Sequence, residues 1–514
     1  MASVTAPTEN APSQQQSEFV KAMTLTDATM LVAGSMIGSG IFIVSADIAR
    51  KVESPAFLLL AWILTGVITL LGALAYGELA AMYPRAGGQY VFLRESMGPL
   101  MGFLYGWTLF VVIQTGTIAA VAVAFGRFSG VLWPAISPDL YNWFPRAEVC
   151  VAVLGCSGPV QAVNLGLSPQ RLVALISIAI LTWINFLGIR EGKFVQTTLT
   201  TVKTGALVLL ILLAVTIGRN ETALSANFGD GNFFGNVDVT GAFMVAFGAA
   251  LIGSLFSSDA WNNVTFAAAE VKNPQRNLPL ALVMGTGLVS LLYVLANVGY
   301  LNVLPIQGDP NGATAVERGI ANATEDRVGT AAMEVMFGAS GATIMAIAIL
   351  ISTFGCNNGL ILAGARVYYA MARDGLFFRG AGVLNKNRVP AIALILQSVW
   401  TALLCLTGTY NQLLNYVIFA ALLFYVLTTL GLFILRAKRP DAERPYRALG
   451  YPLLPALYIA LAGGVMVLIL LSPTSRIEAG SGLVLVLLGI PVYYLWRKVE
   501  GNRPPPPAVS HSTI

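Results

Sequence analysis

Val32-Ala-Gly-Ser-Met-Ile-Gly-Ser-Gly-Ile-Phe42 interrupts the first long apolar segment of this 514-residue chain. The stretch has glycines at 34, 38 and 40, and the last two flank Ser39. Glycine costs about 1 kcal/mol relative to alanine inside a helix, so local unwinding is cheap here. Unwinding would expose backbone N–H groups at the start of the following half-helix, where the helix dipole is positive. The sequence therefore predicts an anion-binding site at Gly38-Ser39-Gly40 that needs no basic side chain.

A second apolar segment is interrupted in a similar way. It reads Gly253-Ser-Leu-Phe-Ser-Ser-Asp-Ala-Trp-Asn-Asn-Val264 and is small and polar in its middle. The two segments are the first and the sixth, so they hold the same place in two halves of five spans. Paired interruptions of this kind indicate a substrate site near the middle of the membrane. Donors from one break and carbonyl acceptors from the other would suit a zwitterionic α-amino acid. The alternative for the glycines is close packing between helices.

The composition is that of a membrane protein built from many helices. Hydrophobic residues make up 56% of the chain and charged residues only 11%, and the mean hydropathy is +0.73. Apolar runs near the roughly 20 residues that cross a bilayer recur along the whole length. We expect about twelve transmembrane helices, near 26–48, 56–83, 99–126, 169–188, 194–217, 240–270, 277–301, 332–372, 390–407, 411–435, 452–471 and 481–497. Residues 23–435 would form a ten-helix transport core, and 436–498 would add two helices.

Positive charge is sorted by side of the membrane. The chain has 30 Lys and Arg against 25 Asp and Glu. With the N-terminus in the cytoplasm, the even-numbered connections and both tails hold about twenty Lys and Arg, against about nine outside. This pattern indicates two cytoplasmic termini and an even number of spans, and it does not indicate nucleic-acid binding. We expect the tails 1–22 and 499–514 to be disordered.

The sequence offers few groups for metal or cofactor chemistry. The single histidine, His511, lies in the C-terminal tail, so we expect no histidine metal site within the membrane. No nucleophile elbow or phosphate-binding loop is visible, and we predict neither a metal, a cofactor nor an enzyme. Cys356 and Cys405 are expected to be core residues. Cys150 and Cys156 lie in a long outer connection, where they could form a disulfide or remain free thiols.

Two ionisable residues are expected at membrane depth, where a charge costs about 2.5–3.5 kcal/mol or more. Lys203 could extend to the inner surface, or it could bond the carbonyls of a broken helix in place of a sodium ion. Asp259, inside the second break, could contact a substrate ammonium or carry a proton. Alternatively, Asp259 could cap the half-helix that follows. Phe256 and Trp261 flank this break, either as gate residues or as packing residues.

Charged residues near the inner ends of two spans allow two interpretations. Glu78 precedes Pro84-Arg-Ala-Gly-Gly-Gln-Tyr90, and Glu270 opens the connection between the sixth and seventh spans. Each segment could be a charged inner gate or a structural turn.

Several ordered motifs resemble those of one transporter superfamily. Met36-Ile-Gly-Ser-Gly-Ile-Phe42 resembles the first-helix signature of the amino acid–polyamine–organocation superfamily. Further motifs resemble bacterial members of the L-type amino acid transporter family: Tyr76-Gly-Glu, Pro84-Arg-Ala-Gly-Gly-Gln-Tyr90, Phe256–Asn263, Lys272-Asn-Pro-Gln-Arg-Asn-Leu-Pro279 and Gly364-Ala-Arg-Val-Tyr-Tyr-Ala-Met-Ala-Arg-Asp374. The resemblance implies an all-α, LeuT-type fold, a five-plus-five inverted repeat with helices 1 and 6 unwound in mid-membrane. It also implies sodium-independent amino acid exchange by alternating access.

The resemblance further implies roles for individual residues. The residues that would surround the α-carboxyl and α-amino groups are Met36, Ile37, Gly38, Ser39 and Gly40. Phe256 would be the extracellular gate, and the backbone at Asp259 would take the ammonium group. Lys203 matches the family lysine that replaces sodium.

The sequence departs from the animal members of that family at the second break. Asp259 and Ala260 stand where those members have paired glycines, so proton coupling stays open. Ser257 and Ser258 make the pocket wall smaller and more polar than in members that carry large neutral substrates. Animal members also join a heavy-chain glycoprotein, a partner that we do not expect for a bacterial relative.

These observations predict a sodium-independent antiporter that exchanges neutral L-amino acids across the inner (plasma) membrane of a bacterium. The alternative within transporters is proton-coupled uptake. From another class, an amino acid sensor usually needs a substantial soluble signalling domain, whereas both tails are short here. The expected partners are an amino acid substrate and the lipid bilayer.

Overall fold

A computed structural model of the chain describes residues 19–137, 166–229, 231–235, 237–407, 410–473 and 475–500. Most of both predicted tails and most of the long connection 133–168 fall outside these ranges. The same is true of Cys150 and Cys156, so their possible disulfide stays a prediction.

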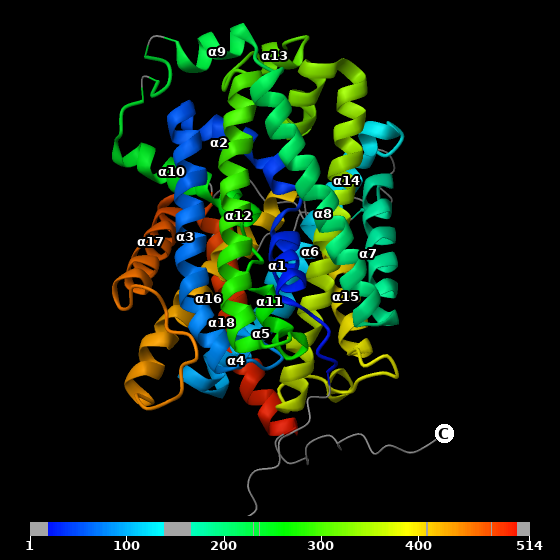
Figure 1. Cartoon of the computed structure of the whole chain (residues 1–514), viewed down its shortest axis with the longest axis vertical. Helices are drawn as coiled ribbons and strands as arrows, with labels where there is room; N and C mark the ends of the chain where they lie inside the picture. The colour runs from blue at the N-terminus through cyan, green and yellow to red at the C-terminus, as the bar shows by residue number, and fades with distance from the viewer. Residues whose placement is uncertain are drawn as a thin grey trace, which may run out of the picture.

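Helices make up nearly all of the described chain (Figure 1). The α-helices are α1 (Leu25–Met36), α2 (Val44–Val52), α3 (Pro55–Met82), α4 (Gln89–Met97), α5 (Pro99–Thr108), α6 (Gln114–Leu132), α7 (Pro169–Leu187), α8 (Ile189–Thr216), α9 (Glu221–Phe228), α10 (Gly241–Ser257), α11 (Asn263–Phe266), α12 (Pro274–Val303), α13 (Ala315–Arg318), α14 (Val328–Arg373), α15 (Ala391–Thr407), α16 (Tyr410–Lys438), α17 (Leu453–Leu471) and α18 (Arg476–Glu500). Shorter helical turns are η1 (Gly40–Phe42), η2 (Leu109–Ile113), η4 (Ala268–Glu270), η5 (Thr324–Asp326) and η6 (Arg379–Gly382). Apart from one bridge between Met23 and Val271, the described residues form no β-structure. The prediction of an all-α protein is confirmed.

Twelve spans can be traced through the described residues. Nine are continuous helical segments long and apolar enough to cross a bilayer, among them the joined segment of α5, η2 and α6. One more is the shorter apolar helix α15. The remaining two are the interrupted pairs, α1 with α2 and α10 with α11. The expected number of about twelve helices is therefore confirmed.

The helix starts have the sequence signals that favour them. Thr24 caps α1 through a capping box, in which its hydroxyl accepts from the Asp27 amide and the Asp27 carboxylate accepts from the Thr24 amide at 2.9 Å. Proline occupies the first position of α3, α5, α7 and α12. A helix start tolerates proline because the missing N–H would have no intrahelical partner there.

Peripheral helices expose apolar side chains, whereas the central helix is buried. Ile176 and Ile180 on α7, and Leu209 and Leu212 on α8, are each about half exposed. Lipid is the solvent that suits such a surface on helices whose backbone is satisfied internally. In contrast, α6 packs against α7, α14, α15 and α16 and is buried along nearly its whole length. The core of the bundle therefore surrounds α6 and the two interrupted spans.

The first and the sixth spans are both interrupted, as predicted. α1 ends at Met36, and α2 starts at Val44 after the short turn η1. α10 ends at Ser257, and α11 starts at Asn263 after a turn in which Ala260 has a φ of 64°. Figure 1 shows α1 below α2 but α10 above α11, so the two broken spans run in opposite directions. This arrangement confirms the inverted repeat with helices 1 and 6 unwound.

The two breaks touch each other at Gly40. A Cβ added to Gly40 would lie 2.1 Å from the Ser257 hydroxyl oxygen and 3.0 Å from the Ser257 Cα. The hydroxyl can rotate away, but the backbone of the opposing break cannot move without displacing α10. Glycine is therefore required at position 40 by the close approach of the two broken spans, in addition to the ease of unwinding that it provides.

We predict that Gly40→Ala lowers the melting temperature of the purified protein, because overpacking of this kind costs about 1–3 kcal/mol. Gly205→Ala is the matched control. A Cβ at Gly205 would meet nothing within 4 Å, and alanine favours the surrounding helix α8. If both variants melt like the parent protein, the assigned contact between the two breaks is wrong.

Candidate functional site

The two breaks meet around a small cavity between the first, third, sixth and eighth spans. Its lining residues are Ser35, Met36, Gly38, Ser39, Gly40, Thr117, Val121, Phe256, Ser257, Asp259, Ala260 and Cys356. Of the residues predicted to bind substrate, all except Ile37 line this cavity. The turn at Gly38-Ser39-Gly40, where the sequence predicts amide donors, therefore borders this cavity.

Lys203 lies on α8, is only 1% exposed, and binds the end of the first half-helix. Its Nζ donates to the carbonyl oxygen of Gly34 at 2.5 Å and to that of Ile37 at 2.6 Å. A third carbonyl, that of Ser352 on α14, lies 3.4 Å from Nζ. An ammonium group has three donors, and here each has an acceptor. The alternative that Lys203 extends to the membrane surface is therefore wrong.

Other side chains also bind carbonyls near the breaks. The Ser352 hydroxyl lies 3.2 Å from the Ile37 oxygen and 3.1 Å from the Gly38 oxygen. The Tyr293 hydroxyl, on α12, lies 2.9 Å from the Met36 oxygen and 3.1 Å from the Ser257 oxygen, so it bridges the two breaks. Sequence reasoning missed both residues. A serine and a tyrosine in apolar helices are common, and nothing in their local sequence marks them.

Cys356 has a second role besides packing. It is buried, as predicted, and its thiol donates to the Ser35 oxygen at 3.0 Å. It also lines the cavity between the breaks. Cys405 is buried too, with its sulfur 3.8 Å from the Ala119 oxygen.

Asp259 is buried in the second break and accepts a hydrogen bond from Tyr425 on α16. The Tyr425 hydroxyl lies 2.5 Å from Asp259 Oδ1. Among the described residues, no lysine or arginine forms an ion pair with this carboxylate. The alternative that Asp259 caps the next half-helix is wrong, because α11 begins at Asn263 and the capping position belongs to Asn262. The carboxylate instead faces the tenth span, α16, where Tyr425 lies.

A chain of buried polar groups continues from Tyr425. Its hydroxyl also lies 3.2 Å from Asn262 Oδ1, and Asn262 Nδ2 donates to Gln89 Oε1 at 2.7 Å. Gln89 Nε2 in turn donates to the Thr428 hydroxyl at 3.0 Å. Gln89 is the first residue of α4, so this chain connects the second break to the short helix between the second and third spans.

The aromatic residues predicted as gates lie in different surroundings. Phe256 lines the cavity between the breaks. Trp261 lies in an aromatic cluster, with its ring centroid 4.7 Å from that of Tyr76 and 5.3 Å from that of Tyr425. It lines a neighbouring cavity that also includes Asp259. Only Phe256 of the two is therefore beside Gly38-Ser39-Gly40 in this conformation.

Glu78 and Glu270 form buried ion pairs between spans, so neither is merely part of a local turn. Glu78 is bound by Arg436 at 2.6 Å and by Arg444 at 3.3 Å. Glu270 lies 3.1 Å from Arg366 on α14, and both side chains are 1% exposed. The first pair ties the end of α3 to the end of α16, and the second ties the segment that follows α11 to α14.

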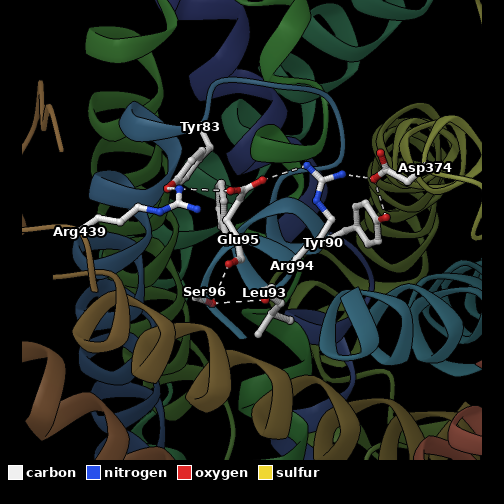
Figure 2. Close-up of polar contacts among 9 residues, drawn as sticks. Tyr83, Tyr90, Leu93, Arg94, Glu95, Ser96, Asp374 and Arg439 are labelled. Atoms are coloured by element: carbon white, nitrogen blue, oxygen red, sulfur yellow. Dashed lines mark hydrogen bonds and ion pairs between the residues drawn. The ribbon is translucent and has the colours of Figure 1, made fainter. Parts of the chain in front are cut away.

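A further cluster of charges ties α4 to the ends of α14 and α16 (Figure 2). Arg94 pairs with Asp374 and with Glu95, and Arg439 pairs with Glu95 at 3.3 Å. The Tyr90 hydroxyl donates to Asp374 Oδ2 at 2.7 Å. Burial, together with the Asp374 charge, raises the pKa of Tyr90, so the hydroxyl stays protonated and remains a donor. These contacts hold the lower end of the bundle together.

Comparisons with known proteins agree with this architecture. The chain matches the family model described as amino acid permease over residues 23–493. The b(0,+)-type amino acid transporter 1 of Mus musculus is 29% identical over 479 residues, which are 93% of this chain and 88% of the relative. The large neutral amino acids transporter small subunit 2 of Homo sapiens is 32% identical over 477 residues, or 92% and 80%. The serine/threonine exchanger SteT of Bacillus subtilis is 30% identical over 487 residues, or 94% and 98%.

A bundle of apolar spans with a polar cavity between two broken helices is the architecture of a secondary transporter. The chain belongs to the amino acid permease family, as the matched family model and these relatives show. It is a multi-pass membrane protein of a family of amino acid transporters, which confirms both the predicted family and the prediction that it is not an enzyme.

We predict that Lys203→Met lowers the melting temperature substantially and abolishes transport. Methionine keeps the length of the side chain but removes the ammonium donor to the Gly34 and Ile37 oxygens, and leaving a buried polar group unpaired costs about 1–3 kcal/mol. Lys193→Met is the matched control on the same helix, because Lys193 is partly exposed and pairs with Asp27 at 2.9 Å. Such a pair contributes about 0–1 kcal/mol. Equal melting temperatures for the two variants would contradict the role given to Lys203.

Proposed function

We propose that this protein is a sodium-independent antiporter that exchanges neutral L-amino acids by alternating access. The membership of the family supports amino acid transport, and the exchanger among the relatives supports exchange. The geometry of the site supports the third element of the proposal, namely that transport does not depend on sodium.

The observation that carries this proposal is the position of the Lys203 ammonium group. A sodium ion at this place would need the carbonyl oxygens of Gly34, Ile37 and Ser352, which the ammonium already binds. The ammonium group is covalently attached to α8, so it would not leave the broken helix during the cycle as a bound ion can. Consequently no sodium ion is needed to assemble the substrate site.

The cavity between the breaks suits the constant part of an amino acid. Amide groups near Gly38-Ser39-Gly40 would donate to the α-carboxylate, since the start of a helical segment favours an anion. The carbonyl groups of the second break, at Phe256 and Asp259, would accept from the α-ammonium group. Phe256 would close the cavity from the outer side.

The charge pattern supports a location in a bacterial inner membrane with both termini in the cytoplasm. The described start and end of the chain lie at the same, lower end of the bundle in Figure 1. The positive-inside rule then assigns that end to the cytoplasm. We propose that the protein works without a heavy-chain partner, as expected for a bacterial relative.

We predict counterflow in proteoliposomes that are preloaded with alanine, serine, threonine or leucine. A labelled amino acid outside should enter the loaded vesicles much faster than empty ones. The rates in sodium and in choline buffers should be equal, because Lys203 occupies the oxygens that sodium would use. Counterflow that requires sodium would overturn the proposal, and so would the failure of all four amino acids to drive it.

Proton-coupled uptake is the second candidate, and the surroundings of Asp259 favour it. The carboxylate is buried in the membrane, has no ion-pair partner among the described residues, and lies beside the substrate cavity. A carboxyl group in that environment could take up and release a proton during transport.

A pH gradient separates the two candidates. For an exchanger, we expect no accumulation of amino acid in empty vesicles under an inward proton gradient. We also expect Asp259→Asn to keep counterflow within about tenfold, the equivalent of one hydrogen bond, because asparagine can still accept from Tyr425. Gradient-driven accumulation that is lost in Asp259→Asn would instead establish proton symport.

A further inference from the structure

A second cavity, different from the one that Trp261 lines, adjoins the cavity between the breaks, and its wall combines polar and apolar side chains. The two cavities share Thr117, Asp259 and Ala260. The lining residues of the second are Gln89, Tyr105, Leu109, Ile113, Gln114, Thr117, Asp259, Ala260, Asn262, Asn263, Phe266, Leu360, Ala421 and Tyr425. Because the cavities share these residues, the second cavity lies next to any molecule whose charged groups are held between the breaks.

Most polar groups of this wall already have partners. Gln114 Nε2 donates to the Leu360 oxygen at 2.7 Å, and the Thr117 hydroxyl donates to the Ile113 oxygen at 2.7 Å. Asn262 and Gln89 belong to the chain of polar groups described above. These bonds hold the side chains in place, so the wall is preformed.

Asn263 is different. Its side chain is 2% exposed, yet its Nδ2 has no hydrogen-bond partner among the described residues. Buried polar groups in proteins are nearly always paired, because an unpaired one is costly. Asn263 is the first residue of α11, three positions after the turn at Ala260. An amide that is held beside a cavity without a partner points to a ligand that supplies one.

We propose that the substrate side chain enters this second cavity and forms a hydrogen bond with the Asn263 amide, so that the protein prefers neutral amino acids with a hydroxyl or carboxamide side chain. This inference rests on the proposed function and narrows its substrate class. A hydroxyl or a carboxamide offers both a donor and an acceptor, and it therefore fits either orientation of the asparagine amide.

Apolar side chains of the same shape fit the site less well. A site that is built to hydrogen-bond its substrate rejects an analogue that lacks the polar group, since the buried groups of the protein are then left unpaired. The Asp259 carboxylate lies in the wall of both cavities, which disfavours acidic side chains. Its Oδ1 is bound by Tyr425, so one of its two oxygens is already used.

The test compares isosteric pairs, threonine with valine and asparagine with leucine, as competitors of counterflow and as stabilising ligands in a melting assay. In the parent protein we expect threonine and asparagine to compete at least about tenfold better than valine and leucine, which is the effect of one buried hydrogen bond. Valine or leucine competing equally well would overturn the inference, and so would lysine or ornithine competing better than threonine. Failure of the proposed function is distinct, because then no amino acid would drive counterflow at all.

Variants of Asn263 identify the group responsible. In Asn263→Leu we expect the threonine-to-valine ratio to fall to about one, mainly because threonine binds more weakly. If Asn263 had a merely structural role, the variant would bind threonine and valine more weakly to the same extent. The threonine-to-valine ratio would then stay unchanged, and that result would overturn the inference. Asn263→Ala, which removes the amide without filling the space, gives the same test if the leucine variant does not fold. Asn297→Leu is the control, because this buried asparagine bonds Ser45 and the Tyr293 carbonyl away from both cavities and should not change the ratio.

Discussion

The ammonium group of Lys203, 2.5 and 2.6 Å from the carbonyl oxygens of Gly34 and Ile37, is the contact that makes a broken helix stable inside this bundle. In a bilayer, every backbone polar group has to find a partner within the protein, since lipid supplies none. A helix that unwinds at Gly38-Ser39-Gly40 frees carbonyl groups at the end of its first half. Burial of an isolated charge would be still more costly. The hydrogen bonds between Lys203 and the freed carbonyls therefore offset both costs, that of the unpaired carbonyls and that of the buried charge.

The same requirement explains the neighbours of the first break. Ser352 and Cys356 on α14, and Tyr293 on α12, bind carbonyls that Lys203 does not reach. Tyr293 also contacts the Ser257 oxygen of the second break, and Gly40 packs directly against Ser257. The two breaks are consequently held against each other by side chains of helices that remain continuous. This arrangement leaves a polar cavity at the centre of the membrane while its walls stay fixed.

The two buried ionisable residues, Lys203 and Asp259, have different surroundings. Lys203 stabilises the broken helix, whereas Asp259 lies where a substrate would be recognised. Lys203 is fully bound by backbone oxygens and takes no part in lining the cavity. Asp259 is bound by one tyrosine hydroxyl and lies in the walls of both cavities, and Asn263, whose Nδ2 has no partner in the described part of the chain, lies in the wall of the second. In the proposed mechanism these are the groups that meet the substrate. The polar chain through Asn262 and Gln89 then connects these groups to α4, which is tied by ion pairs to the lower end of the bundle.

The sequence by itself determined the spans and the two breaks, because apolar length and glycine content are local properties. It marked Lys203 as a charge at membrane depth but left its role open between two interpretations, and the family resemblance favoured carbonyl binding. It did not determine which atoms satisfy the breaks. Tyr293 is 257 residues from Met36, and Ser352 is 315 residues from Ile37, so only the packing of the helices brings them together. Asp259 was open between capping and other roles on sequence grounds. The tertiary structure decided against capping, since the turn at Ala260 places the start of α11 at Asn263 and directs the carboxylate to Tyr425. The lack of a partner for Asn263 Nδ2 among the residues that the structure describes is likewise visible only in the fold, because a missing partner is a property of the surroundings and not of the residue.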